Sequence, residues 1–119
     1  MRVMPIRYTD DIAASAGFLR ALGLDDGSRS RGGGWAEMLA GGGAVGPHVA
    51  AEAEEPRRAG DTELSFVTDE PLEEVRHRLL RAGFGDAHII DESFGRSLRV
   101  TDPDGVLVQV DEHDTALYT

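Results

Sequence analysis

The sequence predicts an α+β domain in which two tandem βαβββ units form a curved mixed sheet, shaped like a cup. The first observation behind this prediction is a duplicated segment: residues 19–24 read LRALGL, and residues 80–84 read LRAGF. The second is that both copies follow an acidic start signal and precede short runs typical of strands. One copy is too small to bury its own apolar face, so the two copies are expected to form a single domain over residues 1–119.

The first unit, about residues 1–52, is expected to begin with a strand over residues 3–8. A helix follows, capped by one of the side chains at residues 9–11 and ended by Gly23. The apolar positions of this helix have the spacing of one buried face: Ile12, Ala16, Leu19 and Leu22. Three strands should come next, over residues 24–30, 35–40 and 44–50, with hairpin turns at the two triple-glycine runs.

The second unit, about residues 61–113, follows an acidic, proline-containing stretch that predicts a linker over about residues 53–60, within Ala51 to Gly60. It should begin with a strand over residues 63–68. A helix then starts with Pro71 at its first position and ends at Gly83. Its apolar stripe is Leu72, Val75, Leu79 and Ala82. The last strands are expected over residues 87–91, 96–101 and 106–110, and the polar residues 111–114 are expected to form a solvated tail that includes His113.

The final strand alternates between an apolar face and a mixed one. Val106, Val108 and Val110 share one face, and Leu107, Gln109 and Asp111 share the opposite face. Such alternation indicates that one side of the sheet packs on a helix and the other side faces the hollow of the cup.

Composition excludes several classes of function. A formal charge of −10 argues against nucleic acid as a partner and favours cationic ligands. No apolar run approaches the roughly 20 residues that a membrane span needs, and no secretory signal is visible before the first expected strand. The absence of cysteine excludes disulfides and thiolate chemistry, so a cytoplasmic location is expected.

Two segments carry a resemblance to a known family. They are residues 11–24 in the first unit and residues 94–110 in the second, where an Asp-Pro-Asp-Gly turn joins the last two strands. With the βαβββ duplication, this pattern resembles the vicinal oxygen chelate superfamily, which includes glyoxalase I, extradiol dioxygenases and bleomycin-resistance proteins. The resemblance implies a cup-shaped cavity that encloses a small-molecule ligand, and it implies a homodimer.

The resemblance also implies where a metal would bind, because metal-dependent members typically place one ligand on the first and one on the last strand of each unit. The first of these positions falls near Met4, where no His, Glu or Gln occurs. The other three offer His48, Glu63 and Gln109, whose atoms could bind a divalent Ni, Co, Zn, Mn or Fe ion. A surface position is the alternative for His48, because Pro47 precedes it and the expected linker follows.

Because this metal set is incomplete, the sequence favours a binding protein of the bleomycin-resistance type, with a small molecule such as an antibiotic as its ligand and with no cofactor. The candidate ligand-binding residues are aromatic, soft or polar side chains on or beside the expected strands: Tyr8, Trp35, Met38, Glu63, Phe94, Arg96 and Gln109. The alternative is a metal-dependent enzyme of the glyoxalase, epimerase or dioxygenase type that uses His48, Glu63 and Gln109.

Overall fold

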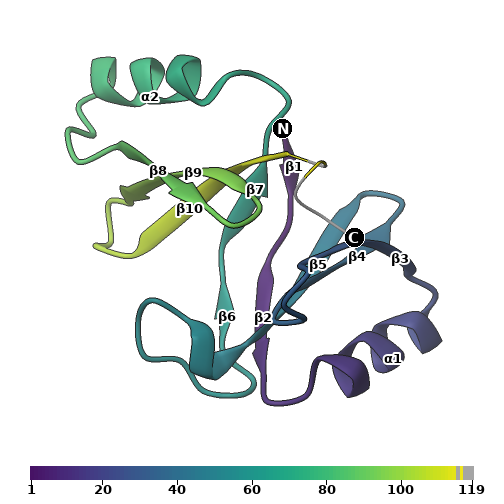
Figure 1. Cartoon of the computed structure of the whole chain (residues 1–119). Helices are drawn as coiled ribbons and strands as arrows, with labels where there is room; N and C mark the ends of the chain where they lie inside the picture. Colours follow the sequence, from purple (N-terminus) through teal and green to yellow (C-terminus); the bar gives the residue numbers. More distant parts are fainter. Residues whose placement is uncertain (115, 117–119) are drawn as a thin grey trace.

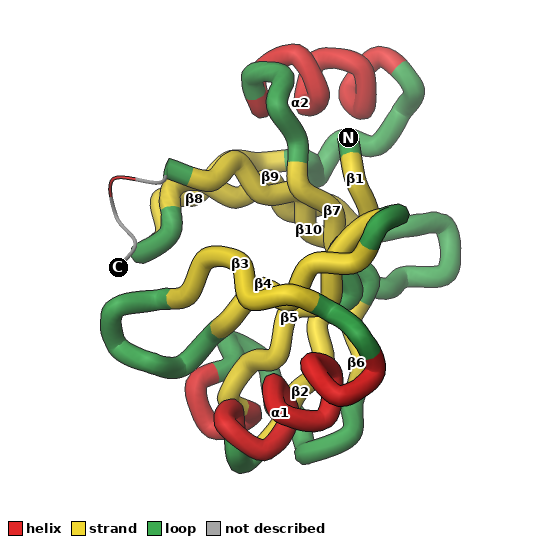
Figure 2. Tube along the Cα trace, turned by 90° about the vertical axis from the view of Figure 1, so that its right-hand side faces the viewer, coloured by secondary structure: helices red, strands yellow, loops and turns green. Residues whose placement is uncertain are grey.

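Two five-stranded sheets face each other, and one helix lies on the outer side of each (Figures 1 and 2). The computed structural model describes residues 1–114 and 116. The sheet of the second unit has the strand order β1 (Arg2–Val3), β7 (Ser65–Val67), β10 (Leu107–His113), β9 (Gly95–Thr101) and β8 (His88–Glu92). The sheet of the first unit has the order β3 (Asp25–Arg29), β4 (Ala36–Ala40), β5 (Gly43–Val49), β2 (Ile6–Thr9) and β6 (Thr62–Glu63). The helices are α1 (Ile12–Leu22) and α2 (Leu72–Arg81).

Both units have the same strand connectivity, which confirms the α+β fold class with two βαβββ units. In each unit the strand before the helix pairs in parallel with the last strand, β2 with β5 and β7 with β10. The two strands between are added by antiparallel pairing. A parallel pair needs a long connection, and the helix supplies it in both units.

The opening strands of the two units run antiparallel to each other and join the two sheets. Their register stays constant from the pair Arg2 and Val67 to the pair Arg7 and Thr62. The prediction of one unbroken strand in each unit was wrong, because each strand changes from one sheet to the other in its middle. In the first strand the change falls at Pro5, which has no backbone N–H to donate to a ladder. In the second strand it falls at Leu64.

The helices begin and end largely as their sequences predict. The Asp11 side chain accepts a hydrogen bond from the Ala14 N–H at 3.0 Å, which satisfies one free donor of the first turn of α1. Gly23 and Gly83 have φ values of 110° and 99°, in the left-handed region that a glycine adopts without strain. One correction concerns Pro71, which precedes α2 in an extended conformation instead of occupying its first helical position.

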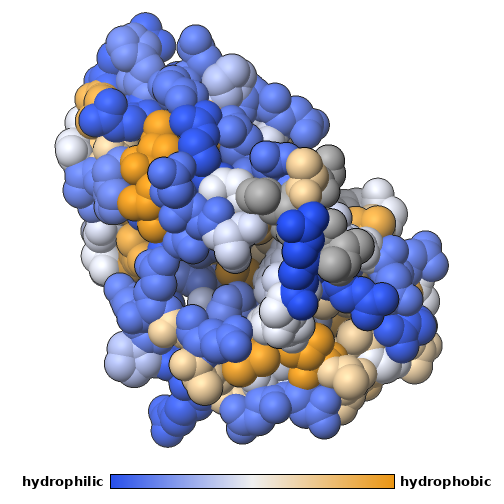
Figure 3. All heavy atoms as spheres, in the orientation of Figure 1, coloured by the Kyte–Doolittle hydropathy of each residue, from blue (hydrophilic) through white to orange (hydrophobic). Residues whose placement is uncertain are grey.

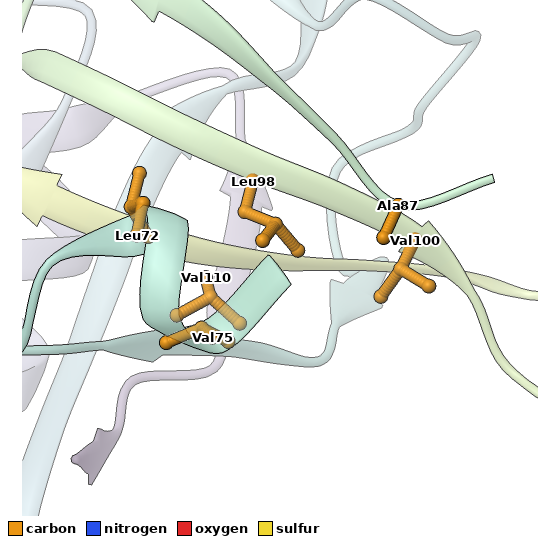
Figure 4. Close-up of a cluster of buried hydrophobic side chains, with 6 residues drawn as sticks. All are labelled: Leu72, Val75, Ala87, Leu98, Val100 and Val110. Atoms are coloured by element: carbon orange, nitrogen blue, oxygen red, sulfur yellow. The ribbon is translucent and has the colours of Figure 1, made fainter. Parts of the chain in front are cut away.

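The larger apolar core lies in the second unit, between α2 and its sheet. It consists of Leu72, Val75, Ala87, Leu98, Val100 and Val110 (Figure 4). The outer surface of α1, by contrast, is apolar and uncovered in the single chain: Phe18 and Leu22 are both 64% exposed. In Figure 3 tan and orange atoms gather low in the view, over α1, whereas the surface over α2 is mostly blue.

Two segments differ from their predicted structure. The stretch predicted as a linker begins with a short 3₁₀ helix (Ala50–Glu52) and continues as a loop that packs against both sheets. The predicted solvated tail is instead the end of β10, which runs to His113, and Asp111 in it is 1% exposed. In the part of the chain that the structure describes, neither helix has the length and apolar character that crossing a membrane requires.

Candidate functional site

A pocket of about 140 Å³ lies between the two sheets and receives side chains from both units. The first unit contributes Ile6, Tyr8, Ser30, Trp35 and His48, and Glu63 joins them because β6 pairs with the sheet of the first unit. The opposite wall consists of Glu92, Ser93, Phe94, Arg99, Leu107, Gln109 and Asp111. The segment between the units adds Glu52, Glu54, Glu55 and Arg57.

The alternation of β10 decides which of its side chains reach the pocket. Leu107, Gln109 and Asp111 line it, whereas Val108 and Val110 pack in the core under α2. The face assignment made from the sequence is therefore confirmed for these five residues. Val106 lies before the strand and is exposed.

One polar cluster in the pocket centres on the Glu63 carboxylate. The Tyr8 hydroxyl donates a hydrogen bond to it at 2.5 Å, and the Arg57 guanidinium lies 3.3 Å from its other oxygen. The same guanidinium lies over the Tyr8 ring, 5.4 Å from its centroid. Burial, and then the hydrogen bond to Glu63, raises the pKa of the Tyr8 hydroxyl, so it stays protonated as a donor.

A second polar cluster centres on Arg99, whose side chain is 10% exposed. Its guanidinium donates to Glu54 at 2.7 Å and to Glu92 at 3.1 Å, and its Nε donates to the Ser97 hydroxyl at 2.8 Å. The Ser97 hydroxyl in turn donates to Asp111 at 2.8 Å. One guanidinium thus ties the segment between the units to the sheet of the second unit.

The carboxyl groups around Arg99 do not ionise alike. Burial, and then the neighbouring carboxyl of Glu54, raises the pKa of Glu92 to about 7. Burial also raises the pKa of Asp111 to about 6, although Ser97 and the Gln109 amide both donate to its carboxylate. Glu54 shifts the other way: its interaction with the Glu92 carboxyl, and then Arg99, lowers its pKa. As the pH falls toward 7, Glu92 is therefore the first of these three carboxyl groups to take up a proton.

An aromatic cluster forms the remaining wall. The Trp35 ring lies 6.4 Å from Phe94 and 5.4 Å from His113, centroid to centroid, in edge-on geometry. His113 therefore packs inside the molecule, contrary to its predicted place in a solvated tail, and burial lowers its pKa. Trp35 and Phe94 come from different units, and both line the pocket.

Most of the predicted site residues lie together in this pocket. Those that line it are Tyr8, Trp35, His48, Glu63, Phe94 and Gln109. Met38 lies elsewhere, buried in β4 beside a separate hollow under α1. Arg96 also lies outside the lining, because Glu73 of α2 and Glu112 of β10 bind its guanidinium.

Sequence reasoning missed much of the charge in the pocket. The acidic residues before Glu63 were expected in a linker, and only the tertiary fold brings them to the site. The alternation of β9 could have indicated Arg99. The apolar Leu98 and Val100 on either side of it face α2, so the Arg99 side chain must point to the opposite face, toward the pocket. Arg96 lies two residues before Leu98 and therefore shares its face, on the side of α2.

The three candidate metal ligands all line this pocket, and the Glu63 carboxylate and the His48 Nδ1 already have partners within the protein. The Glu63 carboxylate is bound by the Tyr8 hydroxyl and the Arg57 guanidinium, and a cation at this carboxylate would have to displace Arg57. His48 has its Nδ1 2.9 Å from the Val49 carbonyl oxygen. Within residues 1–114 and 116, no group of three or more His, Asp or Glu side chains is placed to hold a metal ion.

Comparison with known proteins supports the fold. No family model matches the sequence, and no curated protein matches it significantly. Among solved structures, the chain is similar to a glyoxalase/bleomycin resistance protein/dioxygenase superfamily member from Vibrio splendidus 12B01, at 20% identity and a TM-score of 0.58, over 93% of this chain and 97% of that chain. The chain has the fold of this superfamily, the vicinal oxygen chelate fold.

Two further structures share this fold. A protein described as NAD-dependent benzaldehyde dehydrogenase from Legionella pneumophila has 20% identity and a TM-score of 0.65, over 94% of this chain and 99% of that chain. A hypothetical protein from Bacillus halodurans C-125 has 14% identity and a TM-score of 0.65, over 93% of this chain and 92% of that chain. Similarity at these identities shows the fold alone.

Proposed function

We propose that this protein binds a compact, flat, cationic organic molecule in the pocket between its two sheets, and that it sequesters the molecule, as a bleomycin-resistance protein does, without transforming it. The observation that carries this proposal is the charge of the pocket. Among its described lining residues there are six carboxyl groups and only two guanidinium groups. Carboxylates in a recess of low dielectric attract a cation more strongly than the same groups do in water.

The aromatic wall and the volume define the rest of the ligand. Trp35 and Phe94 offer ring faces and edges to a planar molecule, and a cationic ring is attracted to them electrostatically. The cavity of about 140 Å³ is smaller than the roughly 300–1,000 Å³ of pockets for drug-sized ligands. A ligand of one or two rings therefore suits it.

The test uses Trp35, the only tryptophan of the sequence, as a reporter inside the site. N-methylquinolinium, a flat cation with two rings, should quench its fluorescence with a saturable isotherm at pH 8. Neutral quinoline, which has nearly the same shape, should bind at least tenfold more weakly. Equal affinity for both compounds, or no saturation by the cation, would contradict the proposal.

Phe94→Ala should weaken the binding of N-methylquinolinium about two- to twelvefold, because an aromatic contact contributes about 0.5–1.5 kcal/mol beyond its buried area. Phe18→Ala is the matched control, since Phe18 lies exposed on the outer surface of α1. It should leave the dissociation constant unchanged. If the Phe94→Ala variant bound as tightly as the wild type, the aromatic side chains would not contribute to ligand binding, which contradicts this part of the proposal.

The alternative function, a metal-dependent enzyme, predicts a different response. We expect Ni²⁺, Co²⁺, Zn²⁺, Mn²⁺ and Fe²⁺ to leave the melting temperature of the wild type unchanged, because Arg57 and Tyr8 already bind the Glu63 carboxylate. Stoichiometric metal binding that raises the melting temperature, and is lost in His48→Ala, would favour the enzyme. Differential scanning fluorimetry with metal analysis gives both readouts.

A further inference from the structure

Two carboxyl groups of the pocket share a single cation. Glu54, from the segment between the units, and Glu92, at the end of β8, both accept hydrogen bonds from the Arg99 guanidinium. The two differ in exposure: the Glu54 side chain is 57% exposed and that of Glu92 is 26% exposed. Both side chains line the pocket, so a ligand that enters it meets this pair.

The groups around the pair do not neutralise it. The charged or titratable groups that act on the pair are Arg99 from β9, Asp111 from β10 and His88 from β8. Glu63 of β6 and Arg57 of the segment between the units line the same pocket. Arg57 is bound to Glu63, whereas Arg99 forms ion pairs with Glu54 and Glu92 and its charge also acts on Asp111. Three carboxyl groups against one guanidinium favour retention of a proton in the free protein.

We propose that the Glu54–Glu92 pair makes ligand binding proton-linked: a cationic ligand binds the fully ionised pair, and the proton that the pair holds in the free protein is released to solvent. This inference rests on the proposed function and adds the regulation of the same site. The charge of the ligand takes the place of the proton, so the pocket binds its ligand at neutral to alkaline pH and releases it on acidification.

The ionisation of Glu92 gives the direction and the pH window. Burial, and then Glu54, raises its pKa to about 7, so Glu92 is mostly neutral at pH 6 and mostly charged at pH 8. The affinity for a cation should therefore rise with pH across this window. If only the ionised pair binds, the dissociation constant falls about tenfold from pH 6 to pH 8, the change in the ionised fraction of a group with this pKa.

The experiment titrates N-methylquinolinium into the wild type, Glu92→Gln and Glu55→Gln at pH 6, 7 and 8, with Trp35 fluorescence as the readout. The charge of this probe does not change with pH, so any pH dependence belongs to the protein. Glu92→Gln should lose most of the slope and keep at most the roughly twofold change that Asp111, with its pKa of about 6, contributes. Glu55→Gln is the matched control, because Glu55 lines the pocket and is exposed, 3.8 Å from Arg57. It should keep the wild-type slope.

A wild-type dissociation constant that is equal at pH 6 and pH 8, or the full wild-type slope in Glu92→Gln, would overturn this inference and leave the proposed function standing. An absence of saturable quenching at every pH would instead overturn the proposed function. Carbon-13 NMR of labelled glutamate carboxyls in the ligand-free protein tests the inference without a ligand. We expect one resonance to titrate near pH 7 and to disappear in Glu92→Gln; titration of every glutamate below pH 5 would overturn the inference.

Discussion

Replacement of Arg99 by methionine is expected to lower the free energy of unfolding by about 3 kcal/mol at pH 8. Methionine fills much of the space of the aliphatic stem but donates no hydrogen bond. The variant leaves the Glu92 carboxylate without its cation and removes the hydrogen bond that Arg99 donates to the Ser97 hydroxyl. The Ser97 hydroxyl in turn donates a hydrogen bond to the buried Asp111 carboxylate. An ionised group buried without its partner is the source of the loss.

Arg99→Met should lower the free energy of unfolding by less at pH 5.5 than at pH 8. The direction of this pH dependence follows from the raised pKa values of Glu92 and Asp111. Glu92 and Asp111 have pKa values of about 7 and about 6 in the folded protein, above those of the unfolded chain. The stability that their protonated forms contribute is present in acid and is lost as the pH rises through 6 to 7. At pH 5.5 the two carboxyl groups are mostly neutral and need no cation, so the variant should recover much of its stability.

Urea unfolding of the wild type and Arg99→Met at pH 5.5 and pH 8 measures both quantities. Arg20→Met is the matched control, because Arg20 forms an exposed ion pair with Asp26 on the surface. Exposed pairs of this kind contribute about 0–1 kcal/mol, so this variant should change little at either pH. An equal loss in Arg99→Met at the two pH values would show that the charges of Glu92 and Asp111 are not its cause.

Leu98→Ala should destabilise the protein by about 2–5 kcal/mol, the range for removal of a leucine side chain from a close-packed core. Leu98 is 0% exposed, and it lies in the cluster between α2 and the second-unit sheet (Figure 4). Leu64→Ala removes the same atoms from a residue that is 48% exposed, where the opening strand changes sheets. It should cost well under 2 kcal/mol, and a larger cost for Leu64→Ala than for Leu98→Ala would contradict this account of the core.

Local chemistry explains what could be predicted from the sequence. Helix periodicity, the Asp11 cap and the glycines after both helices involve residues close together in the sequence, so the helices could be predicted without knowledge of any tertiary contact. Strand alternation is equally local, and it assigned Gln109 and Asp111 correctly to the face opposite Val108 and Val110. The repeated segment at residues 19–24 and 80–84 then predicted that the chain contains two such units.

The tertiary structure alone decided which charges meet in the pocket. Glu54 and Arg99 lie 45 positions apart, and Tyr8 and Glu63 lie 55 apart. No local pattern specifies such pairs, because they depend on how the two sheets face each other and on the path of the segment between the units. The same holds for the change of sheet at Leu64 in the second opening strand, where no proline marks the position. The sequence by itself therefore determined the repeated unit and its faces, whereas the packing of one unit against the other determined the site, since pairing and desolvation act between groups that only the folded chain brings together.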